Sequence, residues 1–97
     1  MRILAIERAL PGADPDQLTP ELAMAQARRA WELHETGTVR ELYHRADESA
    51  AVLVLECESL EEATEALASL PLVAAGLVEF EILPLRAYPQ ASASETE

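Results

Sequence analysis

The sequence contains no lysine, and all seven of its basic residues are arginines. A chain without lysine cannot form a lysine Schiff base, and it cannot reach a nucleotide phosphate with a P-loop lysine. Eighteen acidic residues against seven arginines give a formal net charge of −11. A field of that sign repels phosphate backbones and anionic headgroups, so we expect neither nucleic acid nor a membrane among the partners.

Cysteine and histidine are also scarce. The single cysteine, Cys57, cannot form an internal disulfide, which favours a reducing, cytoplasmic compartment. The only soft metal ligands are His34, His44 and Cys57, and their spacing matches no metal motif. We therefore expect no metal ion and no other cofactor.

Long apolar runs and catalytic loop motifs are missing as well. The longest uncharged stretch, residues 69–78, is broken by Pro71 and Gly76 and could not span a bilayer. No serine lies in a nucleophile-elbow context, and the three glycines form no phosphate-binding loop. These absences argue against a hydrolase and against a nucleotide-binding protein.

What remains is the composition of one folded domain. The 97 residues are 49% hydrophobic and 26% charged, which is typical of a globular chain with a single core. We expect one domain over residues 1–88. Residues 89–97 are polar, small and acidic, and we expect them to form a flexible acidic C-terminal tail.

The first half of the chain predicts a strand followed by a helix. Residues 2–9 are rich in aliphatic side chains and read as a strand, and residues 10–18 carry the prolines, glycine and aspartates of a loop. Thr19 and Pro20 begin a helix, and Gly37 ends it as a C′ residue. Its apolar sector is expected to contain Leu22, Ala23, Met24, Ala27, Ala30, Trp31, Leu33 and His34.

The second half predicts two strands, a helix and a last strand. Residues 38–45 and 50–57 are strand candidates on either side of a turn, and the second of them is apolar enough to lie at the centre of a sheet. Ser59 and Glu62 form a predicted capping box at the start of the second helix, which Pro71 ends. Residues 77–85 alternate in polarity and predict the last strand.

The order βαββαβ predicts an α+β, ferredoxin-like fold. Its four-stranded antiparallel sheet would carry both helices on one face, with the first and third strands at its centre. The other face would be bare and would expose Leu77, Leu83 and either Ile3 and Ala5 or Leu4 and Ile6. We expect a second copy to cover that face, which predicts a homodimer or higher homo-oligomer.

Three motifs resemble those of the muconolactone isomerase family: GTVRELY (37–43), LPL (70–72) and EFEILPLRAYP (79–89). Together with the loop at residues 10–15, they extend the resemblance over nearly the whole chain. The resemblance implies a dimeric α+β barrel and a cofactor-independent isomerase. The family's first helix carries a lysine and a glutamate toward the substrate, and Ala23 and Gln26 occupy those places here.

Two groups of residues are candidates for a site near the first helix and second strand. His34 lies in the apolar sector of the helix and is either a proton-transfer group or a core histidine that donates to a backbone carbonyl near the helix end. Alternation places Arg40, Leu42 and His44 on one strand face and Tyr43 on the other. The resemblance favours Arg40 as the anchor of a substrate carboxylate; the alternative is a surface ion-pair partner.

Carboxylates of the last strand form the third candidate group. Glu79 and Glu81 have the parity opposite to the core residues and would point toward the uncovered face, where Glu7 could join them. A desolvated carboxylate there could act as a base, and the alternative is a solvated position at a dimer rim.

Taken with the resemblance, these candidates suggest an isomerase that shifts a proton on a small carboxylated lactone or enol acid. His34 or Glu79 would transfer the proton, Arg40 would bind the carboxylate and Tyr43 would donate a hydrogen bond to the enolate. The alternatives are a non-catalytic dimeric binding or assembly protein for a small metabolite, which the loss of helix charges at Ala23 and Gln26 favours, and a cofactorless oxygenase.

Overall fold

A computed structural model describes residues 1–89 of the chain. The elements in chain order are β1 (Arg2–Ala9), the 3-10 turn η1 (Pro15–Gln17), α1 (Pro20–Glu35), β2 (Val39–His44), β3 (Ala51–Glu56), α2 (Leu60–Ala68), α3 (Pro71–Ala74) and β4 (Val78–Leu85). Apart from Pro89, the predicted C-terminal tail lies outside the described residues.

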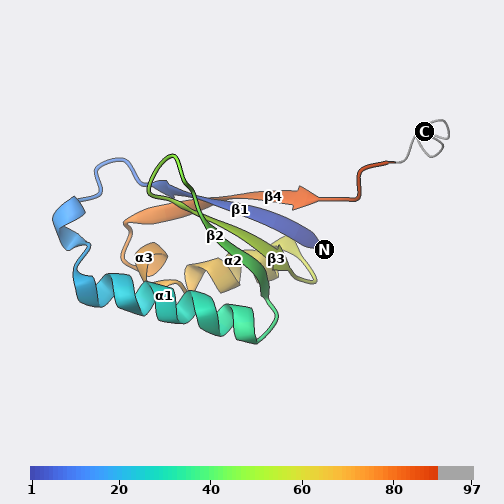
Figure 1. The fold of residues 1–97 in the computed structure, drawn as a ribbon, viewed down its shortest axis with the longest axis horizontal. Helices are drawn as coiled ribbons and strands as arrows, with labels where there is room; N and C mark the ends of the chain where they lie inside the picture. Colours follow the sequence, from blue (N-terminus) through green and yellow to red (C-terminus); the bar gives the residue numbers. More distant parts are fainter. Residues whose placement is uncertain (90–97) are drawn as a thin grey trace.

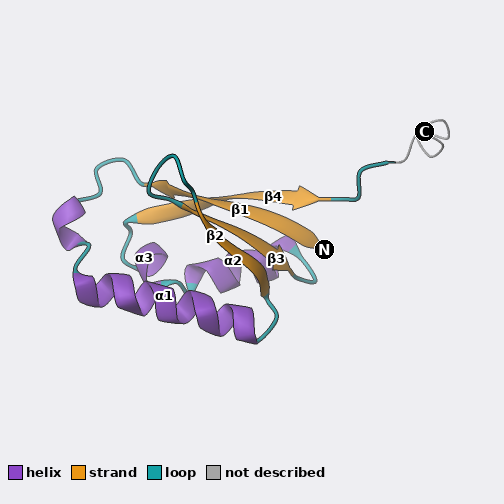
Figure 2. Cartoon of the chain, in the orientation of Figure 1, coloured by secondary structure: helices purple, strands orange, loops and turns teal. Residues whose placement is uncertain are grey.

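The four strands form one antiparallel sheet in the order β2-β3-β1-β4. The helices lie together on one side of this sheet, and no element formed by residues 1–89 lies on the other side (Figure 1; Figure 2). The predicted ferredoxin-like α+β fold is thus confirmed, with β1 and β3 as the central strands. None of the helices within residues 1–89 is long and apolar enough to cross a membrane.

The ends of α1 form where the sequence predicted them. The hydroxyl of Thr19 accepts a hydrogen bond from the amide of Leu22 at 3.2 Å, and Pro20 occupies the first turn. The helix ends before Gly37, whose φ of 86° lies in the left-handed region that glycine adopts without a steric penalty. Local sequence alone therefore sets the position of this helix.

The start of α2 confirms half of the predicted capping box. Ser59 accepts a hydrogen bond from the Glu62 amide at 3.1 Å, whereas the Glu62 carboxylate accepts one from Glu58 rather than from Ser59. After α2 the chain forms the short helix α3, where we had predicted only a connector. Pro71 fits its first turn, and burial of Leu72 stabilises the turn against the rest of the domain.

Strand pairing determines which side chains enter the core. Ile3 and Ala5 of β1 lie opposite Leu55 and Leu53 of β3, and all four are buried under the helices. Full burial of a side chain the size of Ile3 stabilises a fold by about 1.5–3 kcal/mol. The alternate residues of β1 lie on the uncovered face, so of the two predicted sets it is Leu4 and Ile6 that this face carries.

We call the uncovered face, which carries Leu4 and Ile6, the open sheet face. One residue predicted to lie on it, Leu77, does not. Leu83 lies on it opposite Leu4, as expected. Leu77 precedes β4, is only 6% exposed and packs on the helix side, so its predicted place on the open sheet face is wrong. The reason is that β4 begins one residue later than predicted, and the backbone of Leu77 closes the turn by accepting a hydrogen bond from Leu10.

A bulge in β2 changes the alternation that we predicted for this strand. The register with β3 shifts between Val39 and Glu41. Val39 therefore shares the inner face with Leu42, where it is fully buried, instead of lying with Glu41 and Tyr43. Arg40, the residue at the shift, belongs to neither face of the regular ladder.

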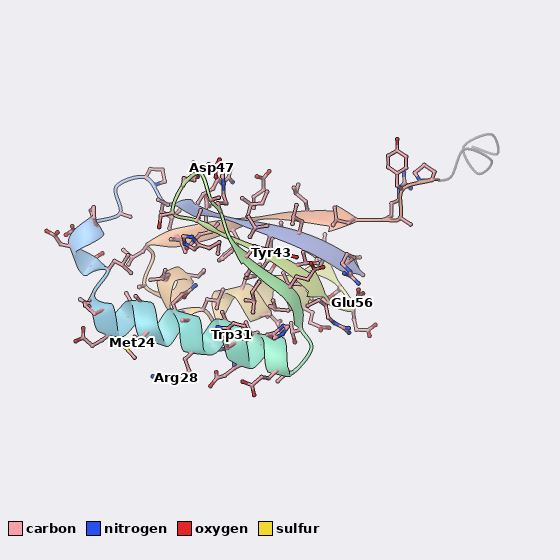
Figure 3. The ribbon with its side chains drawn as sticks, in the orientation of Figure 1. Met24, Arg28, Trp31, Tyr43, Asp47 and Glu56 are labelled. Atoms are coloured by element: carbon pink, nitrogen blue, oxygen red, sulfur yellow. The ribbon has the colours of Figure 1, made fainter. Side chains whose placement is uncertain are left out.

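Helix α1 packs less closely than its apolar sector predicted. Only Leu33 of this helix is buried, while Met24 and Trp31 are 64% and 56% exposed. Met24 and Arg28 project from the side of α1 that turns away from the sheet (Figure 3). The prediction of a broad buried sector is thus wrong for Met24, Trp31 and His34, all of which are exposed. Alanines of the same sector, Ala23, Ala27 and Ala30, border a cavity.

Candidate functional site

The cavity lies between α1 and the inner face of the sheet and has a volume of about 750 Å³. Its walls come from β1, the loop with η1, α1, the β2-β3 hairpin and the start of β4. Buried leucines, among them Leu53, Leu70 and Leu77, form its floor. A hollow of this size with an apolar floor is typical of small-molecule sites, which commonly span roughly 300–1,000 Å³.

Glu7 places a carboxylate on the wall of this cavity. It follows Ile3 and Ala5 on the inner face of β1, and its Oε1 accepts a hydrogen bond from the amide of Ala51 at 2.6 Å. Ladder pairing between β1 and β3 has ended one residue earlier, at Ile6 and Val52. The side chain therefore satisfies a β3 amide beyond the end of the ladder, and this bond fixes the carboxylate at the cavity.

His44 adds an imidazole to the same part of the wall. It is the last residue of β2, lies directly opposite Ala51 in the ladder and borders the cavity. The Glu7 carboxylate accepts a hydrogen bond from the Ala51 amide, and His44 lies opposite Ala51 in the ladder. The carboxylate and the imidazole are therefore both next to Ala51. A pair of this kind can exchange protons with a bound molecule at neutral pH.

The helix side of the cavity carries no charge. Ala23, Ala27 and Ala30 present methyl groups, and Gln26 is the polar residue among them. The side-chain oxygen of Gln26 accepts a hydrogen bond from the amide of Leu72 at 2.9 Å, which ties α1 to the start of α3. At the two positions where the resemblance places helix charges, this chain therefore has a methyl group and an amide with a structural bond.

His34 lies outside the cavity wall. Its Nδ1 is 2.9 Å from the carbonyl oxygen of Val39, and because a carbonyl only accepts, Nδ1 is the donor. The ring also meets Trp31 edge-on, with the ring centroids 5.4 Å apart. The hydrogen bond to a backbone carbonyl agrees with the second alternative for His34, whereas the predicted core position is wrong, because the residue is exposed at the end of α1.

Arg40 and Tyr43 also make contacts of their own. Arg40 is exposed and donates from Nε to the carbonyl of Gly37 at 2.8 Å. Tyr43 touches the cavity rim, and its hydroxyl donates to the carboxylate of Glu41 on the open sheet face. That hydrogen bond, together with the charge of Glu41, raises the pKa of the Tyr43 phenol.

Glu79 and Glu81 lie on the open sheet face, where their parity placed them. Both are within salt-bridge distance of Arg8, at 3.9 Å and 3.8 Å. Glu7 does not join them, because it has the parity of Ile3 and Ala5 and lies on the inner face. The predicted carboxylate group thus divides between two sides of the sheet, and only Glu7 reaches the cavity.

Glu7 lies two and four residues from Ala5 and Ile3, which is the strand period, so the sequence predicts that the three share a face. Which set of β1 residues is buried stayed open in the sequence, and the structure shows that it is the set of Ile3 and Ala5. The face of His44 could be predicted, because alternation places it with Leu42 and the bulge lies before both residues. Its position beside Glu7 could not, because it depends on how β1 and β2 pair with β3. Within residues 1–89 no three His, Cys, Asp or Glu side chains are grouped as metal ligands would be.

Comparison with known proteins adds a family and a set of similar folds. The family model for muconolactone delta-isomerase matches residues 4–91. A muconolactone isomerase crystal structure at 3.3 Å resolution is 27% identical, with a TM-score of 0.75 and coverage of 94% of both chains.

A second solved structure has a similar fold. It is a 5-chloro-2-hydroxyhydroquinone dehydrochlorinase from Burkholderia phenoliruptrix in complex with 2,5-dihydroxybenzoquinone. It is 18% identical, with a TM-score of 0.68, and the alignment covers 89% of this chain and 94% of the other. Comparison with curated protein sequences gives no significant match.

Proposed function

Because the chain belongs to the muconolactone delta-isomerase family, we propose that it catalyses a cofactor-independent proton shift within a small lactone or enol-type carbonyl compound. One observation carries this proposal: the Glu7 carboxylate is held on the wall of a largely apolar cavity by a 2.6 Å hydrogen bond, with His44 beside the same backbone position. A positioned carboxylate next to bound substrate is the arrangement that general base catalysis requires.

The reaction would use Glu7 first as a base and then as an acid. Its free oxygen takes a proton from a carbon α to the carbonyl, or from the vinylogous carbon. The electron pair of the broken C–H bond moves into an enolate, and the same carboxyl group returns the proton to a conjugated carbon. His44 donates a hydrogen bond to the enolate oxygen. This is the role that the sequence predicts for Tyr43, whose hydroxyl instead donates to Glu41.

The Glu7→Gln variant tests this role. Glutamine keeps an amide oxygen that can accept from Ala51, so the fold should be retained, but it cannot take up a proton. We expect proton-shift activity on a butenolide substrate, followed as deuterium incorporation by NMR in D₂O, to fall by about 10²-fold or more.

The matched control is Glu65→Gln, which removes the same charge from an exposed position on α2. It should leave the exchange rate within about twofold of the parent, because the exposed charge is distant from the chemistry and is screened. Equal rates in folded Glu7→Gln and the parent would refute Glu7 as the proton-transfer group. Glu79→Gln, which tests the carboxylate that we predicted first, would then be the next variant.

A non-catalytic binding protein is the second candidate. It is favoured by the helix side of the cavity, where Ala23 carries no functional group and the Gln26 oxygen is already bonded to Leu72. Saturable binding of a lactone with no deuterium incorporation, even at high protein concentration, would favour this function over the isomerase.

We also propose that the chain forms a homodimer through the open sheet face. Leu4 and Ile6 lie there with Val52 and Val54 of β3, and Leu83 of β4 is 37% exposed. Charged side chains of both signs surround these apolar residues, including Arg8 and Glu81. A self-complementary patch of this kind suits a two-fold contact between identical chains.

A further inference from the structure

We propose that the cavity selects an uncharged carbonyl compound, such as a lactone or quinone-like ring without a free carboxylate. This inference rests on the proposed function for the location of the site, and it deepens that function by naming the charge class of the ligand. It departs from our prediction from the sequence, in which Arg40 anchored a substrate carboxylate.

The charges along the cavity wall are mostly negative. Glu7, Asp14 and Glu48 border the cavity, and Arg8 is the one arginine among the described residues that does. The guanidinium of Arg8 is already within 4 Å of two carboxylates on the other side of the sheet. The imidazole of His44 also borders the cavity, and in the proposed reaction it donates to the enolate oxygen. An anionic ligand would therefore meet like charge without an uncommitted cation.

The remaining arginines with identified partners are engaged away from the cavity. Arg2 pairs with Glu56 at 3.1 Å, and Arg29 donates to Ser69 at 2.9 Å. Arg40 donates to the carbonyl of Gly37. Arg45 donates two hydrogen bonds to the carboxylate of Asp47 in a bidentate arrangement, at 2.8 Å and 2.6 Å. Arg28 projects from the side of α1 that turns away from the sheet (Figure 3), and Arg86 follows β4; neither borders the cavity. Because the sequence has no lysine, no long cationic side chain is left for the anchoring role.

The interior of the cavity favours the same ligand class. Leu53, Leu70, Leu72 and Leu77, each at most 9% exposed, form much of the floor. Transfer of a carboxylate from water to such a surface is costly unless a cation pairs with it, whereas a ring with a single carbonyl needs only one donor. The volume of about 750 Å³ also leaves room for apolar substituents on that ring.

Three matched ligands test the inference: a butenolide with a carboxymethyl arm, the corresponding primary amide and the corresponding methyl ester. The acid and the amide are nearly the same in shape and differ in charge. We expect the amide and ester to bind at least about tenfold more tightly than the acid at pH 7 in calorimetric titration, the effect of one poorly compensated charge near a like charge.

A charge introduced at the wall should reverse this preference. Ala23→Lys places a cation at an exposed α1 position that borders the cavity, and Ala74→Lys places the same cation on α3, outside the wall. We expect Ala23→Lys to raise affinity for the acid by about tenfold or more and Ala74→Lys to change it less than twofold.

The outcomes separate this inference from the proposed function. Tighter binding of the acid than of the amide by the parent protein would overturn the charge class, and so would failure of all three ligands to bind. Binding of the amide and ester in the expected order without deuterium incorporation would overturn the proposed isomerase while leaving the ligand class in place.

Discussion

The carboxylate of Glu7 accepts a hydrogen bond from Ala51 at the point where β1 and β3 cease to pair. A backbone carbonyl would occupy this place if the ladder continued. One carboxylate oxygen of Glu7 thus replaces the missing backbone acceptor for the Ala51 amide. In the proposed reaction the other oxygen accepts the substrate proton. Such a bond fixes the orientation of the carboxyl group at low entropic cost, because the strand that carries it is already ordered.

His34 offers a second test at the level of a single residue. Its Nδ1 hydrogen bond to Val39 joins the end of α1 to β2, and its ring lies off the cavity wall. We expect His34→Gln to lower the free energy of unfolding by about 0.5–1.5 kcal/mol, the usual loss for one hydrogen bond, while the exchange rate per folded molecule is retained. Urea denaturation followed by circular dichroism, together with the D₂O assay, measures both quantities.

A different result would change the assignment of this histidine. An exchange rate reduced by about 10²-fold in the fully folded variant, with an unchanged urea midpoint, is the signature of general acid-base catalysis. That combination would assign the proton-transfer role to His34, which is one of the two alternatives that the sequence leaves open for this residue.

At the level of elements, the end of α1 depends on one backbone conformation. Gly37 has a φ of 86°, and a Cβ added there would meet no atom within 4 Å. A substitution is therefore strained in the backbone but not by a clash. We expect Gly37→Ala to lower the unfolding free energy by about 1–2 kcal/mol, measured from the shift of the urea midpoint.

Asparagine provides the matched control for this position. It tolerates the left-handed region better than alanine, so Gly37→Asn should lose measurably less stability than Gly37→Ala. Equal losses in the two variants would mean that the effect does not come from the backbone angle.

The four strands, the two longer helices and their order could be predicted from local sequence. The caps at Thr19 and Ser59 and the stop at Gly37 act within a few residues, and the structure confirms them. Helix α2 already ends at Ala68, and Pro71, the predicted stop, begins α3 instead. The bulge near Arg40 could not be predicted, because it depends on pairing with β3, and it moves Val39 to the inner face that Leu42 and His44 share. The cavity could not be predicted either. A helix face rich in alanine has the same sequence pattern whether it packs directly against a sheet or lines a cavity above it.

At the scale of the whole molecule, the open sheet face predicts self-association. Leu4 lies near its centre, opposite both Val54 and Leu83. We expect the parent to have twice the chain mass of 10.6 kDa, or a higher multiple, in light scattering at micromolar concentration. Leu4→Asp should shift the mass to that of a monomer, because association would bury an unpaired carboxylate in each chain.

Leu60→Asp is the control for this experiment. Leu60 is 42% exposed at the start of α2, so the same substitution adds a charge away from the open sheet face. A parent that is monomeric at this concentration would refute the dimer, and so would a folded Leu4→Asp variant of unchanged mass. Circular dichroism establishes that each variant is folded.

The pairing of β1 with β4 joins the two ends of the described chain, from Arg2 opposite Leu85 to Ala9 opposite Val78. During synthesis, β1 emerges first, yet one of its edges stays without hydrogen-bond partners until the last strand has left the ribosome. Pairs this distant in sequence carry a large loop-closure entropy and form slowly. For most of translation, the central strand of the sheet is therefore an exposed edge that a chaperone or a neighbouring nascent chain could bind.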